Sequence, residues 1–205
     1  MIVIIDYKAG NLASIQRSIN KLGYKSVITQ DADVIIKSER IIFPGVGAAP
    51  EAMKNMERYG IKKALVEYVK KGKPLLGICL GSQIILSKSE EGDVFCLDLI
   101  KGCVKKFTNP CNGNKIKIPH MGWNQVNFLK SHAVFNGIPN QSEFYFVHSY
   151  YPLPDDRETV AADTDYGITF ASVLTFSNIL ATQFHPEKSG EVGLKLLDNF
   201  CRWSI

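Results

Sequence analysis

Apolar and polar positions in the first half of the chain follow two alternating patterns. Short, almost purely apolar runs, typical of buried strands, are separated by segments in which apolar residues recur every three or four positions, as on one face of a helix. We expect strands at 2–6, 26–29, 41–43 and 75–78, and helices at 12–22, 48–59, 61–71 and 80 to about 86. Asn11 is placed to cap the first helix and Gly23 to end it. Strands that alternate with helices predict right-handed βαβ units and a mostly parallel sheet.

The pattern changes at about residue 100, where short strand-like runs follow one another between Gly, Asn and Pro turns. We expect strands at 103–107, 115–118, 125–128, 144–147, 159–162, 171–176 and 179–183, and a final amphipathic helix at 190–203. These strands should add an antiparallel part to the sheet. The prediction is an α/β fold of one domain, residues 1–205, with a parallel central sheet flanked by helices and additional antiparallel strands.

Composition and charge narrow the function only slightly. The 205 residues include 24 basic and 20 acidic side chains, and this mild excess of +4 does not indicate a nucleic-acid or membrane partner. No apolar run approaches the length of a membrane span. The five cysteines include no C-x-x-C pair, so we expect no metal site or redox pair, and no cofactor. Free thiols persist in a reducing compartment, which favours the cytoplasm.

One cysteine stands out by its context. Gly77-Ile-Cys79-Leu-Gly81 follows a predicted strand and opens a predicted helix, which is the nucleophile-elbow pattern G-x-S-x-G with Cys in place of Ser. The glycines permit a sharp turn, and the helix N-terminus favours a thiolate. A buried structural cysteine is the alternative for any single thiol. The flanking glycines, strand and helix make Cys79 a candidate nucleophile.

A cysteine nucleophile needs a base, and His185 is the best candidate among the four histidines. His185 directly follows a predicted strand and precedes Pro186, which favours extended backbone. Residues two apart in an extended segment point the same way, so Glu187 can orient the imidazole. A simple turn histidine is the alternative. His132, in a polar loop, receives no role.

These residues resemble the class I (triad) glutamine amidotransferases. Further segments resemble, along the whole chain, the family of glutaminase subunits of imidazole glycerol phosphate synthase. They are Pro-Gly-Val-Gly at 44–47, Gly-Ile-Cys-Leu-Gly-Ser-Gln at 77–83, Pro-His-Met-Gly-Trp-Asn at 119–124, Phe-Tyr-Phe-Val-His-Ser-Tyr at 144–150 and Gln-Phe-His-Pro-Glu-Lys-Ser at 183–189. The segment at 119–124 is the most particular to this family.

The resemblance implies an activity and a partner. Glutamine would be hydrolysed to glutamate, and the ammonia would pass to a (β/α)8 cyclase subunit in a heterodimer. The cyclase would make imidazole glycerol phosphate and an aminoimidazole carboxamide ribotide in histidine biosynthesis. A paralogue that feeds another amidation, for instance of a surface sugar, and a non-catalytic regulatory module remain as alternatives.

The resemblance also implies a role for each matching residue. Cys79 would be the nucleophile, His185 the base and Glu187 its orienter. The remaining roles are oxyanion donors at Gly47 and the Leu80 N–H, substrate contacts at Gln83, Glu91, Ser149 and Tyr150, and a partner interface at Asn11, Pro119, His120, Met121, Trp123 and Asn124.

Plainer interpretations stay open for several of these residues. The glycines at 45 and 47 could simply make a turn, Gln83 could be an exposed helix residue, and Glu91 could belong to a solvated turn. Trp123 could be a core residue, although a Trp beside Gly and Asn suits an interface. His148 is expected to line the site. One departure is Lys8, where the family commonly has Gly, and it should alter a surface or partner-facing loop.

Overall fold

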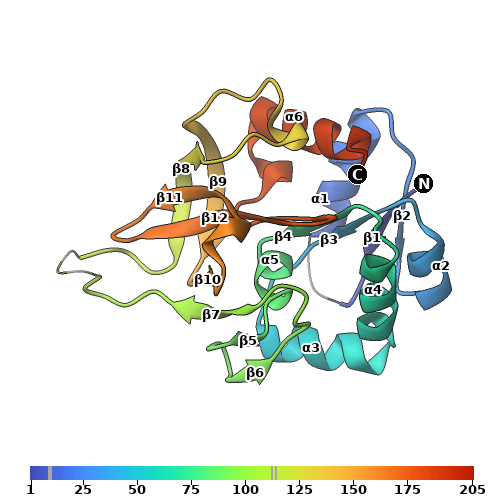
Figure 1. Ribbon diagram of the computed structural model, residues 1–205, viewed down its shortest axis with the longest axis horizontal. Helices are drawn as coiled ribbons and strands as arrows, with labels where there is room; N and C mark the ends of the chain where they lie inside the picture. The colour runs from blue at the N-terminus through green and yellow to red at the C-terminus, as the bar shows by residue number, and fades with distance from the viewer. Residues whose placement is uncertain (9–10, 112, 114) are drawn as a thin grey trace.

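The computed structural model describes residues 1–8, 11–111, 113 and 115–205 (Figure 1). Within the described residues, a nine-stranded sheet has the order β2-β1-β3-β4-β13-β12-β11-β8-β9. Its strands are β1 (Ile2–Ile5), β2 (Ser26–Thr29), β3 (Arg40–Phe43), β4 (Leu75–Ile78), β8 (His120–Phe128), β9 (Ser142–His148), β11 (Val160–Asp165), β12 (Thr169–Phe176) and β13 (Ile179–Thr182). The five strands from β2 to β13 pair in parallel, and the other four pair antiparallel. This confirms the predicted α/β class.

Helices cover both faces of the parallel half, because its strands are apolar on both sides. Along β1, Val3 and Ile5 face one buried cluster, and Ile2 and Ile4 face the other. The helices are α1 (Leu12–Lys21), α2 (Ala32–Lys37), α3 (Ala49–Arg58), α4 (Ile61–Lys70), α5 (Leu80–Ile84) and α6 (Gly190–Arg202). Buried residues of α1 and α6 join one cluster, whereas those of α2, α3, α4 and α5 join the other. None of the helices in the described part of the chain is long and apolar enough to cross a membrane.

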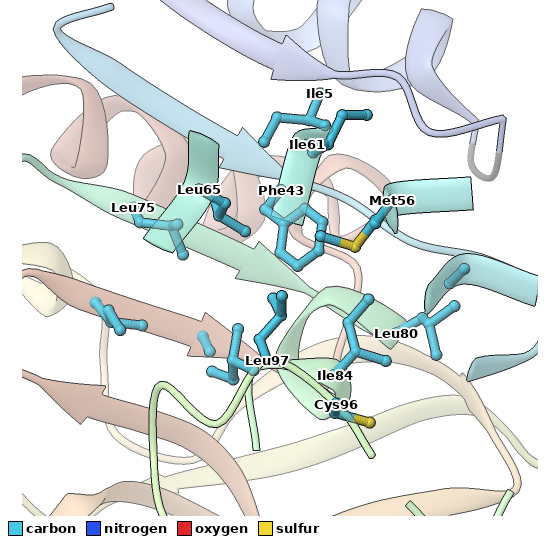
Figure 2. Close-up of a cluster of buried hydrophobic side chains, with 14 of the residues drawn as sticks. Ile5, Phe43, Met56, Ile61, Leu65, Leu75, Leu80, Ile84, Cys96 and Leu97 are labelled. Atoms are coloured by element: carbon cyan, nitrogen blue, oxygen red, sulfur yellow. The ribbon is translucent and has the colours of Figure 1, made fainter. Parts of the chain in front are cut away.

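The cluster under α3 and α4 fixes the strand that carries the site (Figure 2). Phe43 of β3 is fully buried among Met56, Ile61 and Leu65, and Leu80 of α5 belongs to the same cluster. Burial of an aromatic side chain of this size stabilises a fold by about 2–3 kcal/mol. This packing therefore fixes the positions of strand β4 and helix α5.

A second, four-stranded sheet lies beside the first, with the order β10-β7-β5-β6. Its strands are β5 (Lys88–Ser89), β6 (Val94–Phe95), β7 (Gly102–Lys106) and β10 (Tyr150–Pro154). The short strands β5 and β6, the edge strand β10 and the short helix α2 are absent from the sequence prediction. Pro152 and Pro154 argue against a strand in the sequence, but β10 lies at a sheet edge, where proline is tolerated.

The predicted strand at 115–118 is wrong. This segment is irregular, although Ile116 and Ile118 alternate with lysines and pack, half-buried, against the core. The alternation is that of a strand, but none of the described strands pairs with it. The following strand, β8, begins at His120 and not at 125 as predicted, and it pairs with β9 from His120 opposite His148 to Val126 opposite Ser142.

Candidate functional site

Cys79 occupies a sharp turn between β4 and α5. Its backbone has φ 53° and ψ −109°, a left-handed conformation that is uncommon for a residue other than glycine. The close packing of this turn requires glycine two residues later, because a Cβ on Gly81 would lie 2.1 Å from the carbonyl oxygen of Phe43. A Cβ on Gly77 would lie 3.0 Å from the Gly81 carbonyl oxygen. The turn expected from the glycine spacing is therefore present, with Cys79 at its apex.

His185 reaches Cys79 because their strands are neighbours. Strand β13 pairs in parallel with β4, with Thr182 opposite Ile78, and the Cys79 N–H donates to the Thr182 carbonyl at 2.8 Å. Both strands therefore end at the same edge of the sheet, where ligands of open α/β sheets bind. The N–H of His185 donates to the carbonyl of Tyr145 on β9 at 2.9 Å, which fixes the backbone of the histidine.

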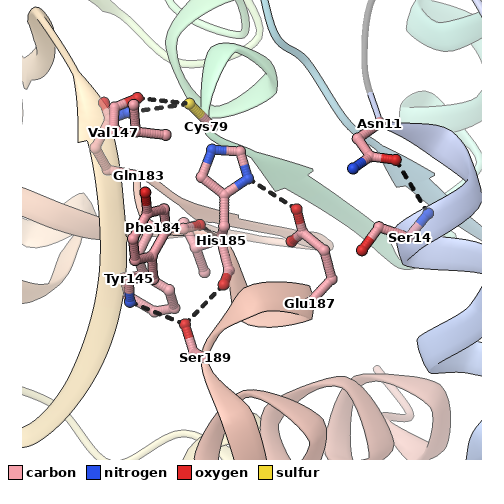
Figure 3. Close-up of polar contacts among 11 residues, drawn as sticks. Asn11, Ser14, Cys79, Tyr145, Val147, Gln183, Phe184, His185, Glu187 and Ser189 are labelled. Carbon is pink, nitrogen blue, oxygen red and sulfur yellow. Dashed lines mark hydrogen bonds and ion pairs between the residues drawn. The ribbon is translucent and has the colours of Figure 1, made fainter. Parts of the chain in front are cut away.

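Glu187 holds the imidazole of His185. Nδ1 of His185 lies 2.8 Å from Oε1 of Glu187, and both side chains are buried. Figure 3 shows the ring between the Cys79 sulfur and the Glu187 carboxylate. Within the described residues, Nε2 of His185 has no hydrogen-bond partner. The nitrogen that faces away from Glu187 is therefore available to the thiol or to a substrate.

The charges at this site stabilise one another. Burial by itself lowers the pKa of His185, but the nearby Cys79 thiolate and then Glu187 outweigh it and raise that pKa to about 10. Burial, with a contribution from the charge of Cys79, raises the pKa of the Tyr7 hydroxyl far above its usual value. The imidazolium form of His185 is thus favoured at neutral pH, while Tyr7 stays a neutral hydrogen-bond donor.

Cys79 and His185 open into a cavity of about 400 Å³. Gly47, Leu80, Gln83, Glu91, Ser149 and Tyr150, expected from the sequence to form the oxyanion hole and bind substrate, all line it, as do Val46, Pro119, Val147 and His148. In the part of the chain that the structure describes, no group of three or more His, Cys, Asp or Glu side chains is placed to hold a metal ion. The cavity therefore offers the thiol of Cys79 beside the imidazole of His185, which the Glu187 carboxylate holds.

The expected oxyanion donor at Leu80 is already engaged. Its N–H donates to the carbonyl of Gly45 at 3.3 Å. The hydroxyl of Tyr7 donates to the carbonyl of Pro44 at 2.5 Å, which helps to fix the segment at 44–47. A Cβ on Gly45 would lie 2.4 Å from that hydroxyl, which explains why glycine stands there. In this arrangement Gly45 covers the N–H that an oxyanion would need.

The two expected substrate contacts, Gln83 and Glu91, also contact the protein. Nε2 of Gln83 donates to the Tyr150 carbonyl at 2.8 Å and to Oε1 of Gln183 at 2.9 Å, so its N–H groups hold the cavity wall. Oε2 of Glu91 accepts the N–H of Ala49 at 2.8 Å, at the first turn of α3, where no side chain of the helix itself provides a cap. Gln83 is buried and is not the exposed helix residue of the plainer interpretation.

The segment at 119–124 divides between surface and interior. Met121 and Trp123 are 62% and 55% exposed, large values for apolar side chains, and Pro119 is exposed as well. His120 is only 2% exposed, so the expectation that its side chain belongs to a partner interface is wrong. The cause is strand alternation: from His120 on, successive side chains of β8 point to opposite faces. Asn124 is half-buried, and its Nδ2 donates to the carbonyl of Asp165 at 2.9 Å.

Asn11 and Lys8, near the N-terminus, both make local hydrogen bonds that account for their positions. Asn11 is exposed and its Oδ1 accepts the N–H of Ser14 at 3.3 Å, which is the predicted helix cap. Lys8 has φ 64°, a conformation that favours glycine. Asp6 holds it there, accepting the Lys8 N–H at 2.8 Å and its Nζ at 3.0 Å. A lysine at this position is therefore compatible with the loop geometry that glycine would adopt.

Gln183, Val147 and Ser189 also shape the site, although the sequence assigns them no role. Nε2 of Gln183 and the carbonyl of Val147 each lie 3.8 Å from the Cys79 sulfur. The hydroxyl of Ser189 donates to the His185 carbonyl at 2.7 Å and accepts the N–H of Tyr145 at 3.0 Å. The position of Gln183, directly after strand β13 and two residues before His185, is the signal that could have identified it.

Comparison with known proteins agrees with this geometry. The profile of the family described as "Glutamine amidotransferase class-I" matches residues 3–203. The chain is 44% identical over 206 residues to the imidazole glycerol phosphate synthase subunit HisH of Dehalococcoides mccartyi strain CBDB1, covering 100% of this chain and 98% of the relative. It is 48% identical over 200 residues to the HisH subunit of Moorella thermoacetica, covering 97% and 93%.

Solved structures share the fold at lower identity. A structure described as a glutamine amidotransferase aligns with a TM-score of 0.72 at 18% identity, covering 98% of both chains. A second structure, described as PurLQS from Thermotoga maritima, also has a TM-score of 0.72, at 16% identity, covering 98% of this chain and 97% of that one. The chain therefore belongs to the class-I glutamine amidotransferases and, among them, to the family of HisH subunits of imidazole glycerol phosphate synthase.

Proposed function

We propose that this chain is the glutaminase subunit of an imidazole glycerol phosphate synthase and hydrolyses glutamine to glutamate and ammonia. The observation that carries the proposal is the imidazole of His185, which is hydrogen-bonded to Glu187 at 2.8 Å and faces Cys79 in the wall of a cavity. Membership of the amidotransferase family supports glutamine as the substrate. The names of the HisH relatives support the biosynthesis of histidine as its purpose. The cytoplasm is the proposed compartment, because free cysteines persist in a reducing environment.

The chemistry is acyl transfer. The thiolate of Cys79 attacks the side-chain carbonyl carbon of glutamine, and the carbon–nitrogen bond breaks while imidazolium His185 protonates the departing ammonia. Water, deprotonated by the now neutral His185, then attacks the thioester, and glutamate leaves as the thiolate is restored. Glu187 keeps Nε2 of His185 directed at the reacting atoms throughout.

The oxyanion that forms on the glutamine carbonyl needs donors at Gly47 and Leu80. Because the Leu80 N–H is bonded to the Gly45 carbonyl, the segment at 44–47 must turn before that donor is free. We infer that docking of the cyclase partner drives this turn. Such gating prevents the isolated glutaminase from releasing ammonia that no acceptor would use.

The partner is a cyclase of (β/α)8 fold, to which the ammonia passes inside a heterodimer. Exposed Met121 and Trp123, with Pro119 at the cavity rim, supply the apolar centre that a protein interface needs. Asn11 and Asn124 are proposed to lie at its polar rim. The product of the complex is imidazole glycerol phosphate together with an aminoimidazole carboxamide ribotide.

The gating is tested by measuring glutamate release by the purified chain alone and by the chain with its acceptor-loaded cyclase partner. We expect at least a roughly hundredfold increase with the partner, because a single oxyanion donor contributes about 10²–10³ in kcat. Equal turnover in the two samples would contradict gating. Absence of turnover in both, with the partner stoichiometrically bound, would contradict the glutaminase function itself.

The pH dependence of the reaction follows from His185. The charges of Cys79 and Glu187 raise its pKa to about 10, so the protonated form needed to release ammonia persists through neutral pH and is lost as the pH rises through about 10. We expect kcat/KM of the complex to fall over that range. In Glu187→Gln the carboxylate no longer supports the imidazolium, so the fall should begin at lower pH. An alkaline limb at the same pH in both proteins would contradict the assignment.

A further inference from the structure

Two buried histidines form a hydrogen-bonded pair next to the cavity. His120 of β8 lies opposite His148 of β9, and Nδ1 of His120 is 2.9 Å from Nε2 of His148. Nδ1 of His148 is in turn 2.8 Å from the carbonyl oxygen of Tyr150. At the other end, Nδ2 of Asn124 is 3.3 Å from Nε2 of His120. The contacts form one continuous chain from Asn124 to Tyr150.

The groups at the two ends determine which atom donates in each of these hydrogen bonds. A carbonyl oxygen only accepts, so Nδ1 of His148 carries the hydrogen and its Nε2 accepts. Nδ1 of His120 must then donate, and its Nε2 accepts from the Asn124 amide. Burial lowers the pKa of His120 to about 4 and that of His148 to about 3, so both rings are neutral at physiological pH. Each ring therefore has one donor and one acceptor, and both are used.

Aromatic neighbours keep the His120 ring in place. It stacks against Tyr166, with ring centroids 3.9 Å apart, and against Phe146, at 4.7 Å. Both interplanar angles are 23°. A ring confined on both faces cannot rotate away from its partner, so a displacement of β8 shifts the hydrogen bond to His148 directly.

The two ends of this series of hydrogen bonds, Asn124 and Tyr150, lie at different functional surfaces. At the outer end, His120 is adjacent on β8 to exposed Met121, and Asn124 is adjacent to exposed Trp123; Met121 and Trp123 form the proposed docking surface. At the inner end, the Tyr150 carbonyl also accepts Nε2 of Gln83, and Tyr150 lines the cavity proposed to bind glutamine. His148 itself lines that cavity.

We propose that His120 and His148 are positioning residues that transmit partner docking on β8 to the glutamine-binding backbone at Tyr150. The inference rests on the proposed function, because it requires a docking partner and a glutamine site. Neither ring contacts the reacting atoms; they act through the Tyr150 carbonyl. Docking that displaces β8 moves His120, then His148, then the cavity wall held by Tyr150 and Gln83.

The test is the activation of glutamine turnover by the cyclase partner in His120→Phe. Phenylalanine keeps the stacking on Tyr166 and Phe146 but removes both hydrogen bonds. We expect the ratio of turnover with and without partner to fall about tenfold, the size of the one lost hydrogen bond that joins His120 to His148. The dissociation constant of the partner, measured by calorimetry, should change less than about twofold, because the His120 side chain is buried. A native ratio in the folded variant would overturn the proposal.

Two further variants separate transmission from mere packing. His120→Asn places an amide N–H near the original Nδ1 and is expected to restore most of the activation. His132→Asn is the matched control: His132 lies outside the cavity, and an asparagine still accepts the Val134 N–H that His132 accepts at 3.2 Å. The control should be activated as the native chain is. Native activation in His120→Phe with a loss in His120→Asn would indicate packing alone, and equal loss in both variants would show that the restored amide donor does not transmit docking; either result would overturn the proposal.

A measurement on the native complex makes the test independent of folding. Nitrogen NMR of labelled histidines should show both rings as the neutral Nδ1–H form, with the His148 Nε2 signal shifting when the cyclase binds. Unchanged signals for both rings on binding would overturn the proposal. If the native complex hydrolyses no glutamine at all, the proposed function fails, whereas loss of the histidine effect alone leaves that function intact.

Discussion

Replacement of Cys79 by alanine is expected to abolish glutamine hydrolysis, with a loss of at least about 10³-fold in kcat for the complex. Among the described residues that line the cavity, Cys79 carries the only thiol, so His185 and Glu187 would be left without a nucleophile. The fold should survive, because removal of the sulfur breaks only weak contacts at 3.8 Å. Labelling by a diazoketone analogue of glutamine, followed by mass spectrometry, should be lost together with turnover.

Cys96→Ala is the matched control for this experiment. Cys96 is a buried thiol that does not line the cavity, and burial raises its pKa to about 11, so we expect it to take no part in the reaction. This variant should keep both turnover and labelling at Cys79. Residual hydrolysis in Cys79→Ala close to the native rate would exclude the thiolate mechanism.

Gly81→Ala is expected to destabilise the protein by about 3 kcal/mol and lower its melting temperature by about 10 °C. The added Cβ would lie 2.1 Å from the carbonyl oxygen of Phe43. Backbone on both sides of the contact must separate to accept it, and β3 is held by the buried cluster around Phe43. Thermal and denaturant unfolding, followed by circular dichroism, measure the loss, and turnover should fall because the Cys79 turn opens.

Gly23→Ala separates this clash from ordinary backbone strain. Gly23 has φ +84°, and a Cβ there would meet nothing within 4 Å. Its substitution should cost only the left-handed strain, about 1–2 kcal/mol. Gly81 has no such positive φ, so its substitution tests the clash alone. If Gly81→Ala unfolds at the native temperature, the close approach to Phe43 contributes nothing and the interpretation of the turn is wrong.

Hydrophobic patterning predicts the parallel half of the fold well and the antiparallel half less well. Strands such as Leu75–Ile78 are apolar on both sides and are bounded by helices, so their class and position are clear. The segment at 115–118 has the alternation of a strand but no partner among the described strands, and pairing is not visible in local sequence. Strand β10 shows the reverse case: its prolines argue against a strand in the sequence, yet it pairs at the edge of a sheet.

The sequence predicts that Cys79 and His185 each follow a strand, but not how those strands pair. The strand at 179–183 is expected in the antiparallel part, whereas β13 pairs in parallel with β4, and this pairing brings both residues to one edge of the sheet. Glu187 lies in a 3-10 turn, Pro186–Lys188, and not in the extended segment expected from the sequence. Hydrogen-bond partners within the cavity are different: nothing local indicates that Leu80 donates to Gly45 or that Gln83 contacts Gln183. The sequence places His120 at the interface together with its neighbours, and only the register of β8 shows that it points inward.

Because β4 pairs with β13, the proposed reactivity of the Cys79 thiol depends on a segment that is synthesised late. Residues Ile78 and Thr182 are neighbours in space, yet about half of the polypeptide separates them in sequence. A nascent chain still on the ribosome therefore carries the cysteine long before the imidazole emerges, and long-range strand pairing must finish before any ammonia can be made. Truncated or stalled chains should consequently consume no nitrogen donor, so that incomplete synthesis carries no metabolic cost beyond the chain itself.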